Sequence, residues 1–129
     1  MLRVDDVVPL PGNGLIVGRT TLDTKSDAVG AFVAASLRAM VEISAEPEVG
    51  LEAAIAAVPE LASAREAQAA ILAATIDVWE GPIQETKGLG AIELSHWEQS
   101  IAYLEGLGLV PNPVTVDDVV ETGLLPGAN

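Results

Sequence analysis

The stretch from Ile92 to Pro126 constrains the fold most, because it contains both a helix and the residues that end it. Within it, Trp97, Ile101 and Leu104 occur at i, i+4 and i+7. This spacing places the three side chains on one face of a helix, and their apolar character predicts that the face packs against other parts of the chain. We therefore expect an amphipathic helix in this stretch.

The residues around this helix predict where it begins and ends. Ser95 and Glu98 have the spacing of a capping box, in which a hydroxyl and a carboxylate three residues apart bind free N–H groups of the first turn. Gly106 and Gly108 follow the last apolar position, and glycine readily adopts the left-handed conformation that ends many helices. The prolines that come next cannot continue a helix. We predict a helix that is capped by Ser95 and stops at these glycines.

Similar patterns predict three helices earlier in the chain, at about Ser26–Ser44, Pro47–Val58 and Ser63–Trp79. Proline suits the first turn of a helix, which supports the start of the second one. In the third, apolar residues recur at i, i+4, i+7 and i+11 from Ala67, which is helical spacing. Thr115 is a candidate N-cap for a short acidic turn near the end of the chain.

Extended structure is predicted at only two places. The valines of residues 4–8 favour a short strand, and Gly14–Arg19 is an apolar run of strand length. Residues 83–91 are expected to form a loop because they contain two glycines and follow a Gly-Pro step. A lone strand cannot pair its backbone groups, so these strands imply a sheet whose other members are absent from this chain.

The predicted fold is therefore mainly α, with four to five helices and one or two short strands, in a single segment covering residues 1–129. Residues 1–25 would form an extended, hinge-like opening segment, and residues 26–129 a helical layer. The residues expected to form the structural core are Phe32, Leu37, Ile71, Trp79, Trp97, Ile101 and Leu104.

Composition excludes several functions. The chain has 19 acidic and 6 basic residues, a net charge of −13, which opposes binding to nucleic acid and to anionic membranes. It has no cysteine, so disulfides and thiolate chemistry are ruled out. We see no run near the ~20 apolar residues of a membrane span. The opening residues also lack the apolar core of a secretory signal peptide.

No catalytic or metal-binding constellation is evident. His96 is the only histidine, and its neighbouring glutamates do not share its helix face, so a surface or helix-start histidine is the simpler interpretation. The Asp5-Asp6 and Asp117-Asp118 pairs are adjacent residues that point in different directions, which is typical of exposed acids in turns. We therefore predict no catalytic residue, no metal and no cofactor.

Several segments, taken in order, resemble one protein family. They are Gly12–Met40 with its GNGLIV start, Glu42–Leu61 with a Glu-Pro step and a Pro-Glu-Leu end, Ile76–Trp79, and Leu89–Pro126 with its Trp-bearing helix and T-x-x-L-P end. This order is similar to the last part of the NMT1/THI5-like substrate-binding proteins of ABC transporters. That group includes proteins for thiamine-pyrimidine precursors, nitrate, and sulfonates such as taurine.

The resemblance implies a fold and a function. The chain would be the C-terminal part of a type II periplasmic binding protein, whose two α/β lobes close on a small solute and deliver it to an ABC permease. The upstream lobe, or a partner chain, would be missing. Periplasmic or extracellular localisation is implied, and an enzyme is not expected. Two alternatives are a pyrimidine-precursor synthesis enzyme of the same family and a helical module that docks on a partner chain.

Within this chain, the segment best suited to line the cleft is Pro11-Gly12-Asn13-Gly14. Gly12 and Gly14 permit close approach of the backbone, and Asn13 offers both a donor and an acceptor. A structural turn explains the same residues equally well. With half of the cleft missing, we expect the chain alone to bind no small molecule tightly.

Overall fold

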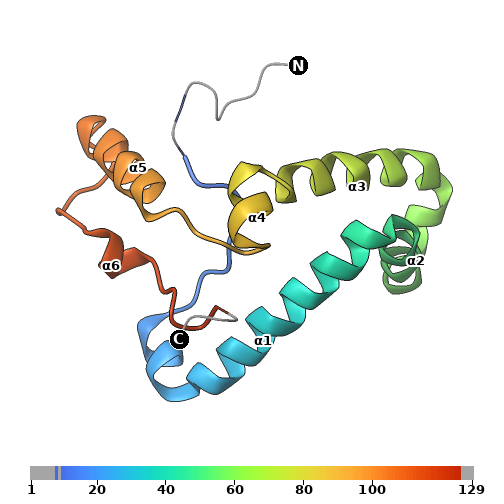
Figure 1. Cartoon of the computed structure of the whole chain (residues 1–129), viewed down its shortest axis with the longest axis horizontal. Helices are drawn as coiled ribbons and strands as arrows, with labels where there is room; N and C mark the ends of the chain where they lie inside the picture. Colours follow the sequence, from blue (N-terminus) through green and yellow to red (C-terminus); the bar gives the residue numbers. More distant parts are fainter. Residues whose placement is uncertain (1–7, 9, 126–129) are drawn as a thin grey trace. The chain divides into compact units, whose positions relative to one another are not determined.

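A computed structural model describes Val8 and Leu10–Leu125 of the 129-residue chain. These described residues form helices joined by short connections and contain no β-strand, which confirms the mainly helical prediction. Of the strand predicted at residues 4–8, all but Val8 lies outside the described residues. The helices are α1 (Arg19–Ala45), α2 (Pro47–Ala57), the 3-10 helix η2 (Pro59–Ala64), α3 (Arg65–Trp79), α4 (Pro82–Lys87), α5 (Leu94–Gly106) and α6 (Val116–Val119) (Figure 1).

The chain divides into two compact units. The first consists of residues 1–26 together with 92–129, and the second is the continuous segment 27–91. The boundary falls inside α1 next to Lys25, whose backbone leaves the helical region at φ −139° and ψ 30°. The predicted boundary between an extended opening segment and a helical layer at residue 26 stays a prediction, although helix already begins at Arg19.

The apolar run Gly14–Arg19 does not form the predicted strand. Leu15 is 61% exposed and Ile16 is fully exposed. A strand needs a neighbour to pair its N–H and C=O groups, and the described residues supply none. Instead, the Gly18 carbonyl accepts hydrogen bonds from the backbone N–H groups three and four residues later, so α1 begins seven residues before the predicted start at Ser26.

In the second unit, α2 lies where the chain turns from α1 into α3 (Figure 1). Proline occupies the first turn of α2, as predicted. Gly50 of α2 lies so close to α1 that a Cβ atom there would stand 2.9 Å from Cγ1 of Ile43. At the start of α3, Arg65 forms ion pairs with both Glu48 and Glu52, one turn apart on α2, the latter at 2.6 Å. These contacts join the three helices.

The sequence pattern predicted the wrong face of α3 as its core face. Ile76 is only 8% exposed, and together with Leu51 of α2 it forms the buried apolar core of the described residues. Ile71, expected in the core, is 59% exposed, and Phe32 of α1 is 60% exposed. Helices α1 and α3 both carry apolar side chains on more than one side. In each helix, the described residues cover only one of these sides. The remaining residues expected in the core are half-buried: Leu37, Trp79, Trp97, Ile101 and Leu104.

Two helix starts also differ from prediction. Part of the loop expected at residues 83–91 is helix α4, because Pro82 at its first turn has a backbone torsion already suited to a helix. Helix α5 begins at Leu94, one residue before the predicted cap, with Glu93 in the cap position. The Ser95 hydroxyl therefore lies inside the first turn and donates to the Glu93 carboxylate at 3.3 Å. The predicted stop is confirmed: α5 ends at Gly106 and Gly108 has a φ of +69°.

By length and hydropathy alone, α1 is long and apolar enough to cross a membrane. Core helices of soluble proteins meet the same criteria, so length and hydropathy alone do not identify α1 as a membrane span. The prediction that the chain has no membrane span did not anticipate such a helix. That prediction rested on counting uninterrupted apolar residues, and Arg38 and Glu42 interrupt the apolar residues of α1.

Candidate ligand-binding groove

A groove of about 340 Å³ lies between α5 and the segment that leads into α6. The α5 wall consists of residues at i, i+3, i+4 and i+7, which share one helix face. The opposite wall is continuous along the chain. The lining residues are Glu98, Ile101, Ala102 and Glu105 on α5, and Val114, Thr115, Val116 and Asp117 on the other side. The whole groove belongs to the first unit.

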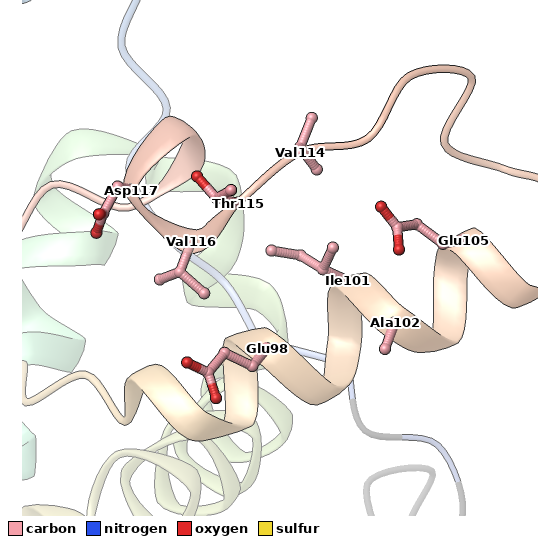
Figure 2. Close-up of a pocket in the computed structure, with 8 residues that line it drawn as sticks. All are labelled: Glu98, Ile101, Ala102, Glu105, Val114, Thr115, Val116 and Asp117. Atoms are coloured by element: carbon pink, nitrogen blue, oxygen red, sulfur yellow. The ribbon is translucent and has the colours of Figure 1, made fainter.

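The centre of the groove is apolar. Figure 2 shows Ile101 pointing from α5 toward Val114 and Val116, while Glu98 and Glu105 stand on either side of it. Ile101 belongs to the apolar stripe predicted from the sequence, so one member of that stripe faces this groove. The arrangement offers a small apolar surface with a carboxylate at each end.

A short hydrogen-bonded cap fixes the wall that faces α5. The main-chain N–H of Thr115 donates to Oδ2 of Asp118 at 2.8 Å, and its hydroxyl donates to the same oxygen at 2.7 Å. These two bonds, the main-chain bond first, lower the pKa of the Asp118 carboxyl below its ordinary value. Thr115 is thus the N-cap of α6, as predicted. Arg19, at the start of α1 in the same unit, donates to the Asp118 carbonyl at 3.5 Å.

The groove is acidic. Glu98, Glu105 and Asp117 line it, and no basic side chain does. An anion such as nitrate, a sulfonate or a phosphate would meet repulsion here, whereas a neutral ligand with hydroxyl or N–H donors would find three acceptors. The groove therefore suits neutral, donor-rich ligands better than anions.

The residues predicted to bind ligand lie elsewhere in the same unit. None of Pro11, Gly12, Asn13 and Gly14 lines the groove, and all but the half-buried Pro11 are exposed. A Cβ atom added at Gly12 or Gly14 would meet nothing within 4 Å, and neither glycine has a positive φ. The fold of the described residues thus does not demand glycine at these positions. Their role in ligand binding stays a prediction.

The groove itself was not predicted, because its two walls are separated by at least nine residues along the chain. Its one sequence signal was the acidic turn after Thr115. Asp117 lines the groove while Asp118 is held by the cap, so the two do not act as an acid–base pair. The Asp5-Asp6 pair lies outside the described residues. His96 is half-buried on α5, and the described residues contain no cluster of His, Asp or Glu suited to a metal.

Comparison with known proteins gives one relative. The whole chain aligns at 25% identity, over 130 aligned positions, with the riboflavin-binding protein RibY of Chloroflexus aurantiacus. The alignment covers 37% of that protein, so this chain spans little more than a third of the length of its relative. No protein-family profile matches the chain, and no solved structure matches it.

These findings correct the expected family. Membership of the NMT1/THI5-like group is not supported, since no family profile matches and the relative is named for riboflavin rather than for a ligand of that group. The short apolar motifs that carried the resemblance, such as the run within Gly12–Met40, are common in helical proteins and specify a family poorly. The prediction that the chain is not an enzyme agrees with the relative, which is a binding protein.

Proposed function

We propose that this chain is part of a solute-binding protein and that its solute is riboflavin. The observation that carries the proposal is the alignment of the entire chain with a riboflavin-binding protein. Because the relative is much longer, we assign this chain to one part of the binding protein rather than to the whole of it.

The groove supports this ligand chemically. Riboflavin is neutral, with a flat ring system and a side chain that carries several hydroxyl groups. Ile101, Val114 and Val116 offer an apolar surface to the ring, and the carboxylates of Glu98 and Glu105 can accept hydrogen bonds from hydroxyl groups. Because the charged residues of the lining are all acidic, the groove fits a neutral solute and disfavours its phosphorylated form.

The wider proposal is that the intact protein serves an ABC importer. It would consist of two α/β lobes that close on the solute, with these helices covering one lobe and the sheet contributed by other residues. Such a protein works outside the cytoplasmic membrane and hands its solute to a permease. The segment Pro11–Gly14 would supply a second set of contacts from the cleft wall.

The direct test is a titration of ¹⁵N-labelled chain with riboflavin, followed by NMR. We expect amide shifts confined mainly to residues 98–105 and 114–117, with a dissociation constant weaker than about 10 µM because only part of the cleft is present. Ile101→Asp should abolish the shifts. The matched control is Leu107→Asp, which changes a side chain that is 56% exposed and outside the groove.

A second titration uses flavin mononucleotide, which adds a phosphate to the same ring and side chain. Two unit charges 6 Å apart in water interact by roughly 0.7 kcal/mol, and three carboxylates face the phosphate dianion. We therefore expect binding at least about tenfold weaker at low salt, and a smaller difference at high salt. Absence of any shift with riboflavin, or shifts that avoid the groove, would overturn the proposal.

A further inference from the structure

The groove wall opposite α5 consists of residues 114–117, and we call it the α6 wall. Helix α6 has only four residues, and none of them is buried. Val116 is half-buried and faces Ile101 of α5 across the groove (Figure 2). A single helical turn is unstable by itself, because few of its backbone groups can pair within it. Contacts with other parts of the chain must therefore hold this wall in place.

Polar contacts hold α6 at both of its ends. At its start, the main-chain N–H and the hydroxyl of Thr115 donate to the Asp118 carboxylate. At its end, the Asp118 carbonyl lies in the last turn, where no later helical N–H is available to it. Nη2 of Arg19 lies 3.5 Å from this oxygen and donates a hydrogen bond to it, although the two residues are 99 positions apart. Arg19 thus joins the start of α1 to the end of α6.

The position of Arg19 on its own helix does not explain this contact. Arg19 is the first residue of α1, and the start of a helix disfavours a cation, whereas the last carbonyls of a helix attract one. Asp23, one turn later on α1, forms no ion pair within the described part of the chain. The charge of Arg19 instead adds to the main-chain and hydroxyl bonds of Thr115 in lowering the pKa of Asp118. The position of Arg19 therefore favours α6 at the expense of α1.

We propose that Arg19 is a positioning residue of the groove, which holds the α6 wall in the conformation that binds solute. This inference rests on the proposed function of the groove. Arg19 is not among the residues that line the groove, so it acts through α6 rather than on the solute. A wall that moves in the free chain has to be ordered when solute binds, and the lost conformational entropy lowers the affinity. Loss of Arg19 should therefore weaken binding although the lining residues stay the same.

Three variants of the chain separate the hydrogen bond from the charge. Arg19→Met removes the charge and the donors but keeps a long side chain with good helix propensity. Lys25→Met is the matched control, because Arg19 and Lys25 are the basic residues of the first unit within the described part of the chain. It changes the net charge equally and leaves the contact with Asp118 intact. Arg19→Lys keeps both a charge and a donor, so it should restore the function.

The first measurement needs no ligand. NMR relaxation of the ¹⁵N-labelled chain gives an order parameter for each main-chain amide, about 0.85 where the backbone is rigid and below about 0.6 where it is flexible. We expect the values for residues 116–120 to fall in Arg19→Met and to stay unchanged in Lys25→Met. The amide of Leu22, which donates to the Gly18 carbonyl in the first turn of α1, should keep its value in both variants.

The second measurement is the riboflavin titration of each variant. We expect the dissociation constant of Arg19→Met to be about three- to tenfold higher than that of the unmodified chain, in the range expected for one lost hydrogen bond from a charged group. Arg19→Lys and Lys25→Met should bind nearly as the unmodified chain does. Circular dichroism should show the same helix content in all variants, because both altered side chains are exposed.

Unchanged order parameters at residues 116–120 in Arg19→Met would overturn the inference, and so would undiminished riboflavin binding by this variant. An equal loss of binding in Lys25→Met would show a general effect of net charge, and failure of Arg19→Lys to restore binding would show that the donor and its charge are not the cause. Both results also count against a positioning role. If the unmodified chain binds no riboflavin, the proposed function fails, whereas the order parameters still decide whether Arg19 holds α6.

Discussion

The two isoleucines of α3 provide a sharp test of which face of the helix packs. Ile76 is 8% exposed and Ile71 is 59% exposed, yet they share one helix and one residue type. Ile→Ala changes helix propensity equally at both positions, so the difference between the two variants isolates burial. The sequence periodicity places Ile71 in the core, whereas the structure places Ile76 there. The two therefore predict opposite answers to which alanine variant is the less stable.

The expected difference follows from the exposed fractions. Truncation of isoleucine to alanine removes three carbon groups, or about 2.4 kcal/mol of transfer free energy at full burial. Weighted by the buried fractions of 92% and 41%, the transfer contributions are about 2.2 and 1.0 kcal/mol. The cavity left at Ile76 adds to the first value. We therefore expect Ile76→Ala to lower the free energy of unfolding by about 2 kcal/mol more than Ile71→Ala.

The assay should report on the second unit alone. Trp79 lies in that unit and Trp97 in the other, so a Trp97→Phe background leaves a single tryptophan to follow during urea denaturation. A unit of this size has roughly 3–5 kcal/mol of total stability, so Ile76→Ala can leave it largely unfolded. Ile76→Val, at a cost of about 0.5–1.5 kcal/mol, keeps the measurement possible. Equal destabilisation by the two alanine variants would refute the assigned core face.

Two further predictions concern the loop after α4 and the cap of α6. Gly88 and Gly90 both have positive φ, but only at Gly90 would an added Cβ atom stand 2.6 Å from Leu37. Gly90→Ala should therefore lower the free energy of unfolding by about 1–3 kcal/mol more than Gly88→Ala in urea denaturation. A Leu37→Ala background should remove this difference. The pKa of Asp118 should lie below its ordinary 3.8 in an NMR titration, so the stability that its cap contributes is present above that pH and is lost as the pH falls through the lowered value. Thr115→Val should raise the pKa of Asp118 only part of the way to its ordinary value, since the main-chain donor remains. A pKa that does not change in this variant would contradict the assigned hydroxyl bond.

Helix positions were predictable because the signals are local. A proline at the start of α2 and glycines at the end of α5 act through their own backbone torsions, whatever surrounds them. The missed helix α4 and the shifted start at Arg19 involve one or two turns, where a few backbone hydrogen bonds outweigh the pattern of side chains. Burial was less predictable, because α3 is apolar on two sides. The periodicity of apolar residues does not indicate which of the two sides packs against another helix.

The candidate site was predictable only in part. Ile101 was expected on an apolar stripe, and Thr115 was expected to start the turn that forms the opposite wall. That these two segments enclose one groove depends on how the chain returns after Gly108, which no local pattern encodes. Glu98 was expected to cap its helix and instead lines the groove, because α5 begins earlier than its capping signal suggested.

The division of the chain has a consequence for its synthesis. Residues 27–91 form a continuous unit, whereas the other unit combines residues 1–26 with 92–129. On the ribosome, the continuous unit can fold once residue 91 has emerged, while the described residues before Asp27 wait for partners from residue 92 onward. Ribosome-bound chains that are just long enough for residue 91 to have left the exit tunnel should therefore already protect α2 and α3 from proteolysis, before the groove between α5 and α6 can form.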